Sequence, residues 1–181
     1  MCRLWEAHSS CPTHRAPLHD LVRRVRSKTL RRKAAAVGLG AFVVLLDQIT
    51  KAWALRAVPA QESITLIPGL LRLHVTENSG AAFSMLQGAG SFLVLAIVVA
   101  VIVILLAIQS SERWWETLTL GLVLGGAMGN LVDRLTRGPG FSDGRVVDWI
   151  DPSFFPTFNL ADTSITVGVA LLLLFSVLSR E

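Results

Sequence analysis

The chain has 181 residues, of which 52% are hydrophobic and 17% are charged, and its mean hydropathy is +0.55. Because a water-soluble domain carries about 25% charged residues, this composition argues against a soluble protein and favours a membrane protein. The formal net charge is +4, and the segment 21–33 alone holds seven Lys and Arg residues and no acid.

The first predicted element is a basic N-terminal tail, residues 1–33, which we expect to be flexible. Its basic run directly precedes an apolar run, which is typical of a cytoplasmic flank under the positive-inside rule. A nucleic-acid-binding patch is the alternative reading of such a run, but we expect no nucleic acid partner. Cys2, Cys11, His8 and His14 also lie in this tail, but their spacing matches no standard zinc pattern, and we expect no metal.

Four apolar segments follow, and each is close to the roughly 20 residues that a membrane-spanning helix needs. They cover about residues 34–58, 91–108, 116–135 and 160–178. The second segment contains no charge, whereas the first and third carry charged residues that make them doubtful on hydropathy alone. The sequence therefore predicts an all-α polytopic membrane domain over residues 34–181, and the basic tail places both termini in the cytoplasm.

Two longer loops, about 59–90 and 136–159, then fall on the extracytoplasmic side. In the first loop, residues 71–76 alternate between apolar and polar side chains. This period of two predicts a short strand, so we expect a small sheet on the outer surface.

Several polar residues lie within the predicted spans. Asp47 and Lys51 are four apart and share a helix face, and Asn130, Asp133 and Arg134 cluster on one side of the third span. Both groups fit two readings, namely buried pairs that hold helices together or part of a functional site, and for Asp47 with Lys51 the two readings are about equally supported. Gly121, Gly125 and Gly129 form overlapping GxxxG spacings, which predict close approach of another helix.

Two further carboxylates lie close to the outer membrane surface. Asp148 ends the second outer loop, and Asp162 begins the fourth span, where Asn159 is a candidate helix cap. Two carboxylates in a low-dielectric site share a proton, so one is able to act as base and the other as acid. The alternative is that both are solvated acids at the interface, as acids at helix starts often are. The motifs HExxH and GxSxG and a phosphate-binding glycine loop are absent from the sequence.

Taken together, the motifs resemble one family, signal peptidase II, the lipoprotein signal peptidase of bacteria. The matching blocks occur in the family's order and are DQITK (47–51), ENSGAAFS (77–84), GGAMGNLVDR (125–134), VVDWI (146–150) and FNLADTSITVG (158–168). The resemblance implies four transmembrane helices with a small extracytoplasmic β-sheet and a surface helix. It also implies an intramembrane aspartyl endopeptidase that removes signal peptides from prolipoproteins by cutting just before a diacylglyceryl-modified cysteine.

On this resemblance the catalytic dyad maps onto Asp148 and Asp162, while Asp151 and Asp133 lie outside it. The substrate-binding or supporting residues that it implies are Asp47, Lys51, Asn78, Gly80, Asn130, Arg134 and Asn159. We expect no cofactor. The expected partners are diacylglyceryl-modified prolipoproteins and membrane lipids, and the expected state is a monomer in the bacterial cytoplasmic membrane with its active site near the extracytoplasmic surface.

Two other classes of protein fit the composition. A small proton-coupled transporter also uses membrane aspartates, but it needs acids aligned across the membrane depth. Here Asp133, Asp148 and Asp162 all fall towards the outer side, which favours chemistry at the surface. A non-catalytic membrane scaffold would tolerate Asn at both dyad positions.

Overall fold

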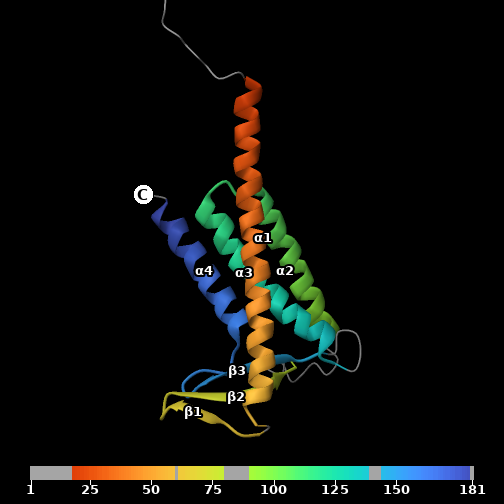
Figure 1. The fold of residues 1–181 in the computed structure, drawn as a ribbon, viewed down its shortest axis with the longest axis vertical. Helices are drawn as coiled ribbons and strands as arrows, with labels where there is room; N and C mark the ends of the chain where they lie inside the picture. Colours follow the sequence, from red (N-terminus) through yellow and green to blue (C-terminus); the bar gives the residue numbers. More distant parts are fainter. Residues whose placement is uncertain (1–17, 60, 80–89, 139–143, 180–181) are drawn as a thin grey trace, which may run out of the picture.

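A computed structural model of the chain describes residues 18–59, 61–79, 90–138 and 144–179. Within them the chain forms four helices and a three-stranded sheet (Figure 1). The helices are α1 (Leu18–Ala57), α2 (Gly90–Ser110), α3 (Trp114–Thr136) and α4 (Leu160–Leu178), and the strands are β1 (Ile64–Ile67), β2 (Leu71–Asn78) and β3 (Val146–Pro152). The surface helix implied by the resemblance is not among the elements of the described residues.

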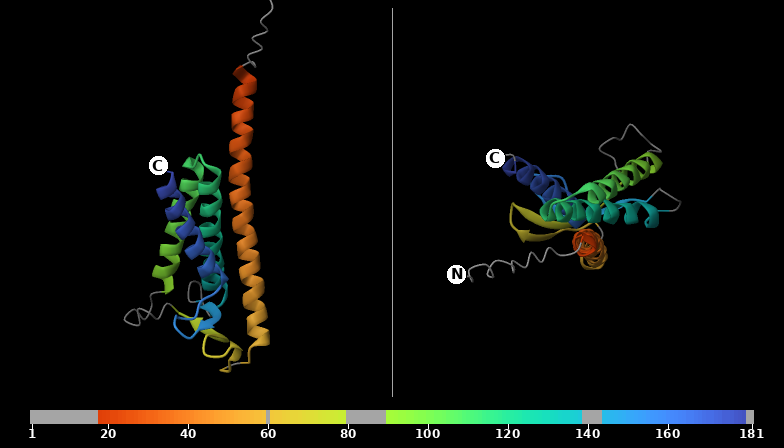
Figure 2. Two further views of the ribbon diagram at one scale, coloured as in Figure 1. Left: turned by 90° about the vertical axis from the view of Figure 1, so that its left-hand side faces the viewer. Right: turned by 90° about the horizontal axis from the view of Figure 1, so that it is seen from above.

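Helix α1 is longer than the span that the sequence predicted. It has 40 residues and begins at Leu18, whereas the predicted span begins at residue 34. At 1.5 Å per residue it is about 60 Å long, and it projects beyond the other helices at one end of the molecule (Figure 2). Residues 18–33 of the predicted tail are therefore helical, because Arg, Lys and Leu are good helix formers and the positive-inside pattern marks a membrane boundary rather than a helix end.

Three helical segments of the described chain are long and apolar enough to cross a membrane, namely Val25–Ala57, Ser91–Ser110 and Leu160–Leu178. Helix α3 is not among them, although it has 23 residues and packs against α1, α2 and α4. Its composition follows from this central position, since a face that contacts other helices is able to carry glycine and polar side chains. The prediction of a mostly helical membrane protein is thus confirmed, whereas the number of membrane spans stays a prediction.

The sheet lies at the end of the bundle opposite the C-terminal end of α4 (Figure 1). Strand β2 is central and pairs antiparallel with both β1 and β3. The strand that the alternation predicted over residues 71–76 is confirmed as part of β2. A register shift interrupts the β2–β3 ladder between Leu73 and Thr76, and the alternation ends at residue 76 because Glu77 and Asn78 are both polar.

The predicted close approach at the glycines of α3 is also confirmed. A Cβ atom on Gly121 would lie 2.6 Å from the backbone oxygen of Ala36, and one on Gly125 would lie 2.7 Å from that of Gly40. Both oxygens belong to α1. Only glycine permits this separation of α1 and α3, and the close contact fixes the height at which the polar residues of the two helices meet.

Candidate active site

The two candidate carboxylates come from different elements and meet at Asn159. Asp148 lies in β3, and Asp162 lies in the first turn of α4. The Asn159 side-chain nitrogen donates to Oδ1 of Asp148 at 2.6 Å, and its backbone N–H donates to Oδ2 of Asp162 at 3.4 Å. One buried amide residue therefore holds both carboxylates at one place.

The start of α4 explains how Asn159 and Asp162 reach these positions. Asn159 is the N-cap, and its side-chain oxygen accepts from the backbone N–H of Asp162 at 2.9 Å. The Asp162 carboxylate in turn accepts from the backbone N–H of Asn159, which completes a capping box. The predicted cap is confirmed, and it holds the Asp162 carboxylate beside Asn159, which also binds Asp148 of β3.

Asp148 is almost completely buried, at 2% exposure. Burial is the largest influence on this carboxyl and raises its pKa from 3.8 to about 6. The negative charge of Asp162 acts in the same direction, whereas hydrogen bonds from Asn78 and Asn159 and the charge of Lys51 oppose it. The Asn78 side chain, at the end of β2, donates to Oδ2 of Asp148 at 3.1 Å. Asp148 therefore retains a proton to higher pH than an ordinary aspartate.

Asn130 on α3 connects the second carboxylate to the interior. Its side-chain nitrogen donates to Oδ1 of Asp162 at 2.7 Å. Its side-chain oxygen accepts from Asn159 and from the ammonium group of Lys51, each at 3.2 Å. The amide therefore has its donor and its acceptor both in use, which fixes its orientation in the site.

A buried ion cluster lies behind Asn130. The Lys51 ammonium group contacts the carboxylates of Asp47 and Asp133, each at 2.7 Å, and all three side chains are fully buried. The sequence paired Asp47 with Lys51, but it did not show that Lys51 also binds Asp133 of α3. The cluster reaches further elements, because Asp47 accepts from the backbone N–H of Ala161 and Asp133 accepts from that of Val147.

Arg134 lies beside the carboxylates with part of its hydrogen-bonding capacity unused. Its side chain is 7% exposed, and the charges of Asp148, Asp133 and Asp162 act on it. Among the described residues its Nε and Nη1 atoms are buried and have no hydrogen-bond partner. A buried guanidinium with unused donors is suited to receive an oxygen of a bound molecule.

Two residues of this network were missed by the sequence analysis. Arg137 donates to Asp133 at 2.7 Å, and Gln48 donates to Asp133 at 3.0 Å. The spacing of Asp133 and Arg137, an acid followed by a base four residues later, was a usable signal. Gln48 had no such signal beyond its place in DQITK. Gly80, which the resemblance also implied, lies outside the described residues.

Asp151, the nearest competing carboxylate in the sequence, has different partners. It forms an ion pair with Arg72 at 2.7 Å and accepts from Thr157 at 3.3 Å. Arg72 is its register partner across the β2–β3 ladder. Asp151 thus contributes to the sheet, and neither of these contacts joins it to the group around Asn159.

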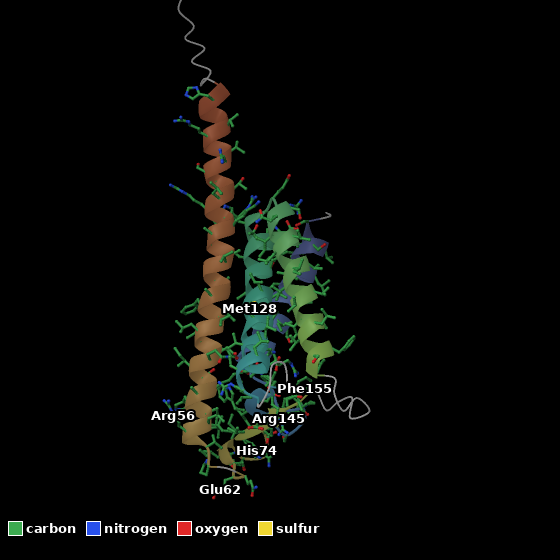
Figure 3. The ribbon with its side chains drawn as sticks, turned by 90° about the vertical axis from the view of Figure 1, so that its right-hand side faces the viewer. Arg56, Glu62, His74, Met128, Arg145 and Phe155 are labelled. Atoms are coloured by element: carbon green, nitrogen blue, oxygen red, sulfur yellow. The ribbon has the colours of Figure 1, made fainter. Side chains whose placement is uncertain are left out.

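In Figure 3, His74, Arg145 and Phe155 mark the sheet end of the molecule, and Met128 lies on α3 within the bundle.

Comparison with known proteins shows that the chain is similar to bacterial signal peptidases. The family model described as signal peptidase (SPase) II matches residues 39–178. The chain is 37% identical over 153 residues to the lipoprotein signal peptidase of Rhodococcus jostii, covering 84% of this chain and 77% of that protein. It is 38% identical over 152 residues to the lipoprotein signal peptidase of Mycobacterium avium, covering 83% of each.

Solved structures are similar as well. A bacterial membrane enzyme determined by the in meso method at 1.9 Å resolution matches with a TM-score of 0.69 and 30% identity, covering 78% of this chain and 91% of that one. A second such enzyme, at 2.3 Å resolution, matches with a TM-score of 0.70 and 28% identity, covering 82% and 90%. The five sequence blocks that carried the resemblance all lie within the residues that the family model matches.

Proposed function

Because the chain belongs to the signal peptidase II family of aspartic endopeptidases, which remove signal peptides from prolipoproteins, we propose that Asp148 and Asp162 are its catalytic dyad. The observation that carries this proposal is the contact of Asn159 with both carboxylates. It fits the known chemistry of paired aspartates, in which one ionised and one protonated carboxyl act on the same water and carbonyl.

The two carboxylates differ in ways that suit different roles. Asp162 is half-buried, accepts hydrogen bonds from Asn130 and Asn159, and lies at the start of a helix, which stabilises negative charge. It is therefore the base. Asp148 is deeper, and its raised pKa favours the protonated form, so it is the acid.

The reaction then proceeds without a covalent enzyme intermediate. Asp162 takes a proton from water, and the resulting hydroxide attacks the carbonyl carbon of the scissile peptide bond. Asp148 donates a hydrogen bond and then its proton to the carbonyl oxygen, which gives a gem-diol. The proton held by Asp162 passes to the amide nitrogen as the C–N bond breaks, and the regenerated carbonyl returns a proton to Asp148.

Arg134 and the amides have supporting roles in this scheme. The unused Nε and Nη1 donors of Arg134 bind an oxygen of the substrate backbone or of its lipid-modified cysteine. Asn130 fixes Asp162, and Asn78 fixes Asp148, without adding charge to the site. Lys51 donates to the side chain of Asn130, and Asp47 binds Lys51, so these two residues fix the position of Asn130.

The membrane arrangement follows from the same proposal. Helix α3 is the fourth span, enclosed by α1, α2 and α4, with both termini in the cytoplasm and the sheet on the outer side of the bacterial cytoplasmic membrane. A diacylglyceryl group on the substrate cysteine anchors the substrate at that surface. The peptide bond just before this cysteine is then presented at the depth of the dyad, and the enzyme acts as a monomer.

The test is cleavage of a purified prolipoprotein by full-length protein in detergent, with the diacylglyceryl-modified and unmodified forms compared. We expect Asp148→Asn and Asp162→Asn each to lower the rate at least a thousandfold while the protein still accumulates in the membrane. Asp151→Asn is the matched control and should retain most of the activity, since Asp151 contacts the half-exposed Arg72. Full activity in either dyad variant would remove that residue from the proposed pair.

A further inference from the structure

A groove at the basic end of the molecule is unrelated to the candidate active site. It lies between the N-terminal half of α1 and the C-terminal end of α2 and has a volume of about 560 Å³. This volume falls within the range of about 300–1,000 Å³ that is usual for small-molecule sites. Counting 1.5 Å per residue, Lys33 at this groove lies about 21 Å along α1 from Asp47.

The wall and floor of the groove are apolar. Ile108 of α2 is buried at its base, while Leu30, Val37 and Leu105 line it with largely exposed side chains. Exposed apolar side chains on helices that are able to span a membrane face hydrocarbon. The lower part of the groove is therefore suited to a hydrocarbon chain.

The upper part of the groove is cationic. Arg26 and Lys33 line it, and residues 26, 30, 33 and 37 follow one another at helical spacing on a single face of α1. Among the described residues Arg26 has neither an ion pair nor a hydrogen bond, and Lys33 contacts the neutral side chain of Gln109. The segment 21–33 contains no acid. Within the part of the chain that the structure describes, no acidic group thus pairs with either cation.

The position of these cations along the axis of the helix bundle indicates whether they contact the membrane surface or its interior. Arg32 donates to the backbone oxygens of Ser111 and Glu112, so this turn of α1 lies level with the end of α2. Arg26 is six residues nearer the N-terminus, about 9 Å further along α1. The N-terminal part of α1 projects past the other helices (Figure 2). We therefore expect these cations to lie at the membrane surface, with the apolar side chains of the groove below them.

We propose that this groove binds one anionic glycerophospholipid of the cytoplasmic leaflet. The phosphate diester lies between the Arg26 guanidinium and the Lys33 ammonium, and the Thr29 hydroxyl, which also lines the groove, donates to it. One acyl chain lies along Leu30 and Val37 on one side and Leu105 and Ile108 on the other. The leaflet follows from the proposed topology, whereas the site itself does not depend on the dyad.

The test is lipid binding by the purified full-length protein in detergent, with phosphatidylglycerol and phosphatidylcholine of identical acyl chains titrated and counted by native mass spectrometry. We expect one saturable phosphatidylglycerol site that binds about 30-fold more tightly than phosphatidylcholine, as two cations near a membrane surface would give. The double variant Arg26→Gln with Lys33→Gln should abolish this preference.

Two controls separate a site from diffuse attraction. Lys28 and Arg31 lie about 200° and 140° around α1 from Arg26, on the opposite face. Lys28→Gln with Arg31→Gln removes the same charge and should keep the preference. Ala34→Trp fills the groove without changing charge and should weaken binding at least tenfold.

The proposal fails if both double variants weaken binding equally, if Ala34→Trp binds as the wild type does, or if glycerol phosphate binds as tightly as phosphatidylglycerol. The last result would show an anion site without a lipid site. Cleavage activity of every variant should stay within twofold of the wild type, which verifies folding. Because the binding measurement needs no cleavage, its outcome stands whatever happens to the proposed dyad.

Discussion

Asn78 is the residue through which the sheet influences the carboxyl groups. It lies at the last position of β2, and its side chain donates to Oδ2 of Asp148 at 3.1 Å. This bond favours the ionised form of Asp148 and so opposes the effect of burial, which raises the pKa to about 6. The pairing of Asn78 with Val146 at the end of the β2–β3 ladder therefore places a hydrogen-bond donor beside the acid that we assign to Asp148.

Removal of this donor should move the pH dependence of cleavage. In the proposed mechanism Asp148 must be protonated, so kcat/KM of the wild type falls as pH rises through a pKa near 6. In Asn78→Ala the charged form loses a hydrogen bond and the pKa rises further. We expect the alkaline limb of kcat/KM to shift upward by about one pH unit, because a hydrogen bond to a charged group contributes about 1.5 kcal/mol or more.

The neighbouring residue provides the control for this shift. Glu77 pairs with Arg145 at 3.2 Å, and both side chains are 58% exposed. Glu77→Gln removes a surface charge from the same strand. It should not shift the alkaline limb of kcat/KM, since exposed ion pairs have small interaction energies. A limb that moves downward in Asn78→Ala would contradict the assignment of Asp148 as the acid.

At the scale of elements, the packing of α1 against α3 sets the position of the ion cluster. A Cβ atom on Gly129 would lie 2.7 Å from Oδ2 of Asp47 and 3.2 Å from Cβ of Ala161. The glycine thus leaves room for the carboxylate that binds Lys51. By contrast, a Cβ atom on Gly38 of α1 would have nothing within 4 Å.

These two glycines give a matched pair of substitutions. Gly129→Ala should lower the free energy of unfolding by about 1–3 kcal/mol and reduce cleavage, because the added methyl displaces Asp47 in a tightly packed interface. Gly38→Ala should be neutral or stabilising by up to about 1 kcal/mol, since alanine has the higher helix propensity. Thermal unfolding in detergent at fixed lipid content measures both, and equal effects of the two changes would refute the packing argument.

The elements differ in how far the sequence predicts them. Hydropathy located α2 and α4 within about two residues, and alternation located β2, because each signal lies within one element. The early start of α1 at Leu18 was not predicted, since charged helix formers carry no hydropathy signal. The central position of α3 depends on its contacts with three other helices, which no local pattern records.

The contacts of the candidate site also differ in how far the sequence predicts them. The cap formed by Asn159 and the capping box with Asp162 are local, so the sequence was sufficient to predict the cap. The bond from Asn78 to Asp148 joins residues 70 positions apart and depends on the β2–β3 register. The contact of Lys51 with Asp133 likewise depends on how α1 and α3 pack. Motif order indicated these residues, but only the fold shows their contacts.

At the scale of the whole molecule, the arrangement of the two ends makes the proposed topology testable. The sheet lies at one end of the bundle, and the projecting part of α1 lies at the other end with the end of α4 (Figure 1). In intact cells a membrane-impermeant maleimide should label Glu62→Cys, near the sheet, in a background without native cysteines. Cys2 and Cys11 of the wild type should be labelled only after permeabilisation, and the reverse pattern would invert the proposed topology.

The buried ion cluster connects four elements of the molecule, α1, α3, β3 and α4. Lys51 and Asp47 belong to α1 and Asp133 to α3. The backbone N–H groups of Val147 in β3 and Ala161 in α4 also donate to these carboxylates. Two helices, the start of a third and the strand that carries Asp148 thus meet at the two carboxylates that Lys51 binds.

Lys51→Met should therefore destabilise the whole protein. It leaves two buried carboxylates facing each other with one fewer cation, and breaking a buried pair in this way costs about 3–5 kcal/mol. Lys51→Met combined with Asp47→Asn restores the balance of charge, since Asp133 retains Arg137 at 2.7 Å and the new amide oxygen can still accept from Ala161. We expect the double variant to recover most of the lost stability in thermal unfolding, which requires a coupling energy of about 3 kcal/mol or more, at the upper end of the usual range.

Cleavage should not recover with stability in this double variant. Lys51 also donates to the side-chain oxygen of Asn130, whose nitrogen holds Asp162. Without that donor the orientation of the amide is less constrained, and loss of one hydrogen bond of about 1.4 kcal/mol corresponds to a roughly tenfold lower kcat. A stable double variant with wild-type kcat would mean that Lys51 serves the fold alone. A stable but slow variant would show that one buried cation both joins the helices and positions the proposed base.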